Sequence, residues 1–247
     1  MKIAICFLST FENHFNYKEL KKQANESKNH KIDIYYYINN EKDEYKINND
    51  YIYFNYDYLK NKFNYKYIFY KNKYYVGLTF LCWLDMYCNH KNEYDIYMFY
   101  ENDLSYFGKK NLFDSINFNN DIIFQKKCIN IKKDLDWYWY KIHDYNILGS
   151  YTIYHSLMNI YCANSNFIEG LLKFMNNNYM HHEGLIPTYA LNNNYKIDYI
   201  NNYIPLYCNY INNIKKIRVY SYDLIHPIKL EETYNRIKFK KNKYYDT

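Results

Sequence analysis

Two carboxylates stand directly after an apolar and aromatic run in the middle of the chain. The run covers residues 96–100 and has the length and composition of a buried β-strand. Glu101 and Asp103 follow it, and side chains two residues apart on an extended segment point the same way. Oxygen ligands of this kind suit a hard divalent cation such as Mg²⁺ or Mn²⁺. The pair therefore predicts a metal site, with a solvated acidic turn as the alternative.

A second group of titratable residues is His181, His182 and Glu183, which Pro187 follows. Proline fits the first turn of a helix, so we expect a helix through residues 188–191 with Glu183 in the loop before it. A carboxylate there is a candidate catalytic base or acceptor-binding group, and a partner for the helix dipole is the alternative. The two histidines are expected to be ordinary surface residues. Zinc binding by the pair is not expected, because no Cys or further His stands at the spacing of a zinc site.

A late His-Pro-x-Lys stretch offers two more candidates. Pro227 disfavours helical backbone at the preceding residue, so His226 is expected on an extended segment. His226 is then a candidate third metal ligand, and Lys229 a candidate contact for phosphate. The alternative for a single histidine is a structural role.

The elements that would position these residues alternate between strands and helices. Strands are predicted at residues 2–8, 32–38, 51–58, 65–70, 96–100, 121–124 and 156–163, and helices at 19–28, 76–88, 110–116, 167–175 and 188–191. Such alternation favours an α/β fold with a mostly parallel sheet. In an open α/β sheet, ligands bind beyond the carboxyl ends of the strands. Glu101 stands at such an end, and so do Leu8, Ser9 and Thr10 after the first strand, which are expected to face a ligand.

One helix start has a capping signature. Asn166 stands three residues before Glu169, at the beginning of the predicted helix 167–175. An N-cap residue followed by Glu at the third helical position satisfies two backbone N–H groups at once. We therefore expect a capping box there.

The composition is strongly biased. The chain has 37 Tyr but only 5 Gly and 3 Pro among 247 residues, as translation of a very AT-rich genome would produce. Tyr is then partly a replacement hydrophobe, so its abundance does not indicate stacking on nucleic-acid bases. The net charge of +6 favours an anionic ligand, although it is spread along the chain. A nucleic-acid partner is not expected.

Cysteine usage and hydropathy indicate the compartment. The six cysteines show no CxxC pair and no zinc spacing, so they are expected to be buried free thiols in a reducing compartment. The apolar run near the start is too short for a signal peptide, and no run approaches about 18 apolar residues. We expect a soluble cytoplasmic protein without a membrane span.

Four stretches in the same order resemble the GT-A glycosyltransferases of a bacterial and viral group. They are YDIYMFYENDL, DWYWY, HHEGLIPT and HPIK, and the similarity spans residues 76–229. Members of that group carry a Glu-x-Asp metal motif after a strand, a Trp-rich segment, a His-x-Glu-x-x-x-Pro-Thr segment and a late His-Pro-x-Lys. The resemblance implies a single GT-A-like, Rossmann-like domain over residues 1–247, with a mixed and mostly parallel sheet flanked by helices. Within it, residues 1–100 would be the nucleotide-binding half, 101–230 the metal and acceptor half, and 231–247 a basic tail.

The resemblance also implies an activity, that of an enzyme moving a sugar from a nucleotide-sugar to a hydroxyl group of a glycan or a protein-linked sugar. Glu101, Asp103 and His226 would hold Mn²⁺ or Mg²⁺ on the donor diphosphate, with a UDP-sugar as the favoured donor. Lys229 would contact the same phosphates, and Glu183 would be the catalytic base or would position the acceptor. A viral member would act in the host cytoplasm. The chain lacks an expected Arg in residues 162–165, so an anion contact is either missing or supplied by Arg218.

Two other classes of function remain open. A metal-dependent nuclease or phosphotransferase also uses acidic residues after a strand, but it needs a nearby catalytic Lys and further acidic ligands. A non-catalytic, basic and Tyr-rich binding protein on a decayed glycosyltransferase fold would keep its stability and would respond neither to metal nor to nucleotide.

Overall fold

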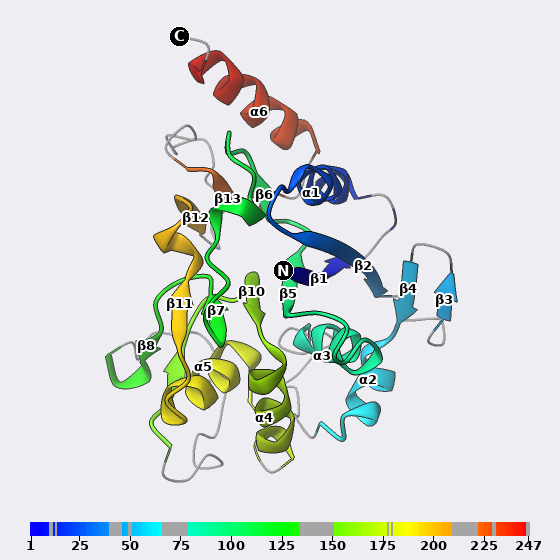
Figure 1. Cartoon of the computed structure of the whole chain (residues 1–247), viewed down its shortest axis with the longest axis vertical. Helices are drawn as coiled ribbons and strands as arrows, with labels where there is room; N and C mark the ends of the chain where they lie inside the picture. The colour runs from blue at the N-terminus through cyan, green and yellow to red at the C-terminus, as the bar shows by residue number, and fades with distance from the viewer. Residues whose placement is uncertain are drawn as a thin grey trace.

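The structure is a computed structural model of the chain (Figure 1), and it describes residues 1–9, 12, 14–39, 46–48, 51–65, 79–133, 151–176, 178, 180–208, 222–228 and 231–245. Its strands are β1 (Lys2–Ser9), β2 (Lys31–Asn39), β3 (Lys46–Asn48), β4 (Tyr51–Phe54), β5 (Ile96–Glu101), β6 (Ser105–Tyr106), β7 (Ile122–Phe124), β8 (Ile129–Asn130), β9 (Tyr154–His155), β10 (Ile160–Ala163), β11 (Ile197–Tyr199), β12 (Leu206–Cys208) and β13 (Leu224–His226). Its α-helices are α1 (Phe15–Glu26), α2 (Tyr56–Lys62), α3 (Phe80–Asn89), α4 (Ser165–Met175), α5 (His182–Asn192) and α6 (Glu231–Tyr245). Short 3₁₀ helices lie at Phe113–Ser115, Ile131–Lys133 and Ile200–Asn202.

A central sheet has the strand order β11-β7-β10-β5-β1-β2-β4-β3. β1 pairs in parallel with β2 and β5, β2 with β4, and β7 with β11. β10 runs antiparallel between β5 and β7, and β3 is antiparallel to β4. A smaller sheet, β12-β13-β6, lies beyond the carboxyl end of β5. The predicted fold class, α/β with a mixed, mostly parallel sheet flanked by helices, is confirmed.

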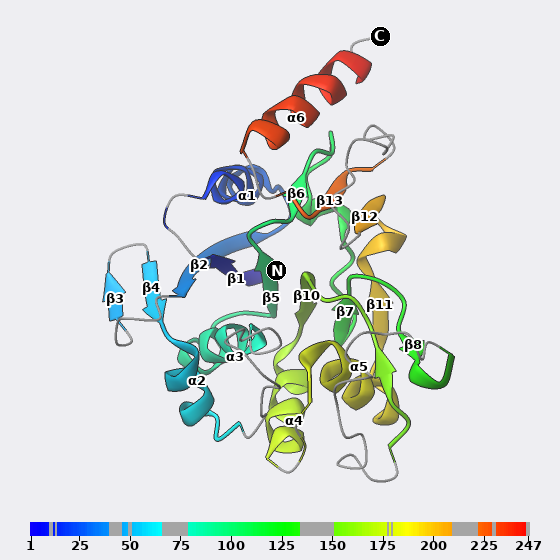
Figure 2. The same cartoon turned by 180° about the vertical axis from the view of Figure 1, so that it is seen from behind.

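Helices cover both faces of the central sheet. In Figures 1 and 2, α1 lies on one side of the sheet, and α3, α4 and α5 lie on the other. The side chains of Ile3, Ile5 and Phe7 pack in the same core cluster as Leu20 and Ala24 of α1. The alternate residues of β1 pack with α3. A strand buried on both faces has to be apolar throughout, which explains the unbroken apolar run of β1.

Several predicted boundaries are wrong. The strand predicted at residues 51–58 ends at Phe54, because the side chain of Asn55 accepts a hydrogen bond from the backbone N–H of Tyr58 and starts α2. The strand predicted at residues 156–163 is only β10, and the helix predicted at 110–116 is a single 3₁₀ turn. The N-cap of α4 is Asn164 rather than Asn166, so the predicted capping box does not form.

Other predictions have mixed outcomes. Cys6, Cys82, Cys88, Cys128 and Cys162 are free as expected, although Cys88 is exposed and Cys128 is only partly buried. Among the described residues, no helix is both long and apolar enough to cross a bilayer. The Trp-rich segment 136–140, residues 66–70, Thr10, Arg218 and Lys229 lie outside the described residues.

Candidate metal centre

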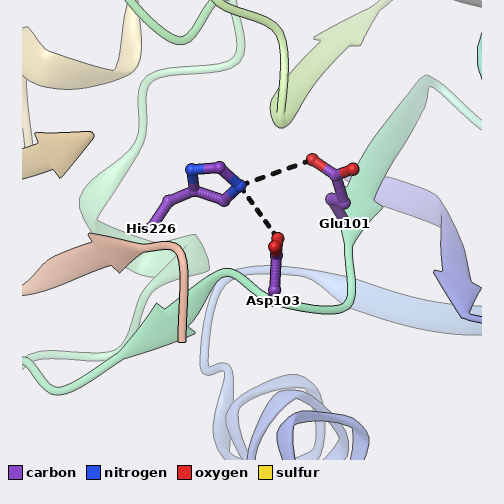
Figure 3. Close-up of side chains that lie close together, drawn as sticks. All are labelled: Glu101, Asp103 and His226. Carbon is purple, nitrogen blue, oxygen red and sulfur yellow. Dashed lines mark ion pairs between the residues drawn. The ribbon is translucent and has the colours of Figure 1, made fainter. Parts of the chain in front are cut away.

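Three predicted ligands, Glu101, Asp103 and His226, meet beyond the carboxyl end of β5. Glu101 is the last residue of β5, Asp103 lies in the turn after it, and His226 ends β13. The Nε2 atom of His226 is 2.9 Å from Oδ1 of Asp103 and 3.7 Å from Oε2 of Glu101 (Figure 3). One ligand atom from each residue lies within 4.8 Å of the others. We refer to these three residues as the metal corner.

The ligand atoms of the metal corner suit a hard cation. The two carboxylates are ligands that suit Mn²⁺ or Mg²⁺, and the imidazole nitrogen favours Mn²⁺ of the two. The side chains of Glu101 and Asp103 are 29% and 15% exposed, whereas that of His226 is 5% exposed. A cation could thus be reached from solvent on the carboxylate side, with the imidazole closing the other side.

The turn after β5 is tied to β1. The backbone N–H of Asn102 donates to the carbonyl of Leu8 at 3.1 Å, and its side-chain amide donates to Oγ of Ser9 at 3.3 Å. Asn102 therefore turns aside, as the alternation along an extended segment predicted. The side chains of Leu8 and Ser9 are buried at this edge, and their contact with a ligand stays a prediction.

The strand that carries His226 runs beside the same turn. β13 pairs with β6, with Ile225 opposite Ser105, and the backbone N–H of Ile228 donates to the carbonyl of Asp103 at 2.6 Å. The extended backbone expected at His226 is confirmed. Residues more than a hundred positions apart in the sequence are thereby fixed side by side.

Sequence reasoning missed three polar residues that support the metal corner. The side-chain amide of Asn159 donates to Oε2 of Glu101, and the backbone N–H of Asn159 donates to Oε1 of Gln125 at 2.7 Å. Asn16, in α1, bonds to the turn that carries Asp103. His14 caps α1, and burial lowers its pKa to about 4 against the opposing charge of Asp103. In a chain so rich in Asn, no spacing singles out two of them.

The predicted placement of Glu183 is wrong. α5 begins at His182, so Glu183 lies in its first turn rather than in a loop, and Pro187 is inside the helix. Proline has no N–H to donate to the carbonyl four residues before it, which is that of Glu183. The backbone N–H of Ser156 donates to this carbonyl instead, at 3.0 Å. A neighbouring loop thus satisfies the acceptor that would otherwise favour ending the helix before the proline.

The two histidines before Glu183 are buried, not on the surface as expected. The side chains of His181 and Glu183 are 1% and 7% exposed. Nδ1 of His181 accepts a hydrogen bond from the backbone N–H of Glu183, so His181 is the N-cap of α5. His182 stacks on Phe80 with ring centroids 5.9 Å apart. We refer to His181, His182 and Glu183 as the α5 corner, which lies outside the metal corner's group of ligands.

No protein-family model matches this sequence, and no curated protein is significantly similar to it. Solved structures do match the fold. One is the crystal structure of the apo form of mouse xyloside xylosyltransferase 1, which is 10% identical over 92% of this chain and 97% of that chain, with a TM-score of 0.42. Similarity at this level transfers no residue role, so the functional argument stands on the chain's own residues.

Proposed function

We propose that this protein is a metal-dependent glycosyltransferase that moves a sugar from a nucleotide-diphosphate-sugar, with a UDP-sugar favoured, to a hydroxyl group of a glycan or a protein-linked sugar. The observation that carries the proposal is the convergence of Glu101, Asp103 and His226 at the carboxyl edge of an α/β sheet. Ligands bind at that edge in open α/β sheets. The resemblance of four sequence stretches to GT-A enzymes supports the same activity.

The proposed chemistry assigns separate tasks to the residues. Sugar transfer expels a nucleoside diphosphate, and a bound Mn²⁺ or Mg²⁺ would offset the negative charge that develops on it. Glu101, Asp103 and His226 would hold the cation. Lys229 would add a positive charge near the same phosphates, and Leu8, Ser9 and Thr10 would contact the nucleotide.

Glu183 is proposed to act on the acceptor side. The loop before β10 links the two corners, because Ser156 bonds to the backbone of Glu183 and Asn159 bonds to the carboxylate of Glu101. The carboxylate of Glu183 would deprotonate or orient the acceptor hydroxyl. Its task would thus be separate from that of the metal ligands.

The rest of the proposal concerns the chain as a whole. Residues 1–247 would form one domain, with nucleotide bound mainly by residues 1–100, metal and acceptor by residues 101–230, and a basic tail after them. The protein would act in the cytoplasm, or in the host cytoplasm if it is viral.

A nuclease or phosphotransferase is less well supported, because the metal group found among the described residues has only two carboxylates.

The test is binding of nucleoside diphosphates with and without Mn²⁺, measured by calorimetry. A thermal-shift screen selects the base, since a ligand at about 100 times its dissociation constant stabilises a protein by about 2.7 kcal/mol. Asp103→Asn is expected to weaken the Mn²⁺-dependent affinity by about 100-fold or more while the fold is kept, because loss of a direct ligand exceeds the effect of a supporting residue. Asp57→Asn removes an exposed carboxylate in α2 and serves as the control. Binding by Asp103→Asn as tight as that of the wild type would overturn the proposal.

A further inference from the structure

A buried asparagine in α1 is bonded on both sides of the Asp103 turn. Asn16 is 2% exposed. Its Nδ2 atom donates to the carbonyl of Asn102 at 2.6 Å, and its Oδ1 atom accepts from the hydroxyl of Ser105 at 2.7 Å. Asp103 lies between these two partners in the sequence. The nitrogen and the oxygen of the Asn16 side-chain amide therefore bond to the residues on either side of the proposed metal ligand Asp103.

Asn16 is itself held in place. Its backbone N–H donates to Nδ1 of His14 at 3.2 Å, which is the cap of α1, and the backbone N–H of His14 donates to the hydroxyl of Tyr36 at 3.1 Å. The first turn of α1 is thereby joined to β2. Asn16 thus connects the Asp103 turn to a helix start that is anchored on the sheet.

The bonding pattern requires an amide. The carbonyl of Asn102 needs a donor, and the hydroxyl of Ser105 donates to an acceptor, so the partner must offer one of each at the end of a short side chain. A carboxylate would place an oxygen against the carbonyl of Asn102, and an apolar side chain would leave two buried polar groups without this partner. Asn is the residue of that size that satisfies both.

We propose that Asn16 is a positioning residue for the metal corner, one that sets where the carboxylate of Asp103 lies relative to Glu101 and His226. This inference rests on the proposed metal site. Other hydrogen bonds also hold the turn. Those of Asn102 join it to β1, that from Leu104 N–H to the carbonyl of Glu101 joins it to β5, and that from Ile228 N–H to the carbonyl of Asp103 joins it to the segment after β13. Asn16 supplies the hydrogen bonds between this turn and α1, so replacing Asn16 removes the link between Asp103 and that helix.

The same helix contains a matched control residue. Gln23 lies two turns further along α1 and is 7% exposed. Its Oε1 atom accepts from the backbone N–H of Leu112 at 3.0 Å, and its Nε2 atom donates to Glu19 at 3.2 Å. Gln23 is therefore also a buried amide that ties α1 to another segment, but that segment carries no metal ligand. A purely structural role for Asn16 would make the two residues equivalent.

The experiment compares Asn16→Ala with Gln23→Ala by melting temperature and by Mn²⁺ affinity, the latter from the electron paramagnetic resonance signal of free Mn²⁺ without nucleotide. Both variants are expected to melt several degrees below the wild type, since each leaves buried polar groups unpaired. Only Asn16→Ala is expected to lose Mn²⁺ affinity, by about 10-fold or more, as is typical of residues that orient metal ligands. Ser105→Ala, which removes one of the two bonds, should show a smaller loss in the same direction, and it replaces Asn16→Ala if that variant does not fold.

Two results would overturn the inference while the metal site stands. One is an unchanged Mn²⁺ affinity in folded Asn16→Ala, or in Ser105→Ala where that variant replaces it. The other is an equal loss of affinity in Gln23→Ala, which would mean that general loosening of α1 is responsible. Failure of the proposed function looks different, because the wild type would then not bind Mn²⁺, or Asp103→Asn would bind it equally well.

Discussion

The metal corner and the α5 corner both bring histidine and glutamate together, yet their side chains meet different surroundings. In the metal corner, one carboxylate from the end of β5 and one from the turn after it are partly exposed and face a histidine from late in the chain. In the α5 corner, His181 and Glu183 are neighbours in sequence and buried, and His181 caps the helix to which Glu183 belongs. The first arrangement leaves two carboxylate side chains partly exposed, whereas in the second the polar groups belong to the buried start of a helix.

The difference shows how the same residue types take separate tasks. A cation at the metal corner would meet two carboxylates that are partly exposed. A substrate that reached Glu183 would have to approach a carboxylate covered by its surroundings, which suits one acceptor hydroxyl better than a hydrated ion. We expect the two corners to respond differently to substitution and to pH.

The largest expected effect concerns His14, the buried histidine behind the metal corner. Burial lowers its pKa from 6.5 to about 4. As pH falls from 6.5 to about 4, the unfolded chain binds a proton at His14 that the native state does not, so the free energy of unfolding falls in this window and is intact above it. The loss attributable to His14 should reach about 3 kcal/mol. Urea unfolding across this pH range measures it.

His14→Asn is the comparison, because Asn keeps the ability to cap α1 but does not titrate. The wild type should lose more stability than this variant as pH falls. Curves that stay parallel for the two proteins would show that His14 is not the group responsible. Carboxylates such as Asp114 and Glu19, whose pKa values are lowered, titrate in both proteins and cancel in the difference.

The next effect tests the α5 corner. Glu183→Gln keeps the size of the side chain and removes the base, so donor affinity should persist while sugar transfer falls by about 100-fold or more. Turnover with a matched acceptor and donor affinity by calorimetry measure the two quantities. Glu169→Gln, in α4 with a partly exposed side chain, is the control and should change neither. Lost donor binding with a normal rate at saturating donor would instead place Glu183 in the donor site.

The smallest effect separates ligation from packing at His226. His226→Ala should weaken nucleoside diphosphate binding by roughly 10-fold when Mn²⁺ is present and have little effect when it is absent. The reason is that Nε2 of His226 faces the two carboxylates, so its contribution to nucleotide binding would pass through the cation. Titrations with Mn²⁺ and with a chelator provide the two values. Equal weakening in both would assign His226 a packing role like that of His182.

The sequence predicted the parts of the metal corner that depend on local pattern. An apolar run with two carboxylates after it has few alternatives to a strand end, and Pro227 restricts the backbone of His226 by sterics alone. The meeting of the two segments could not be derived from spacing, since it depends on the pairing of β13 with β6. The sequence makes His226 a candidate third ligand, and the resemblance to a family implies that it joins the two carboxylates.

The predictions that failed depended on contacts from elsewhere in the chain. Pro187 predicts a helix start. The N–H of Ser156 instead donates to the carbonyl of Glu183, which the proline leaves without a donor, and α5 extends on both sides of Pro187. Asn16 and Asn159 support the ligands through hydrogen bonds to residues about 60 to 90 positions away. Their roles follow from tertiary structure and carry no local signal.

The distance in sequence between the ligands also sets an order of events during synthesis. Asp103 is translated roughly 120 residues before His226, which at typical rates of synthesis is on the order of 10 s. By the end of that interval β1, β2 and β5 would be outside the ribosome, so the nascent sheet edge would present two carboxylates without the histidine. The proposed cation would be held firmly only after β13 has paired with β6. Metal loading would then mark the completion of this part of the chain, and ribosome-bound chains that end before His226 would bind Mn²⁺ weakly.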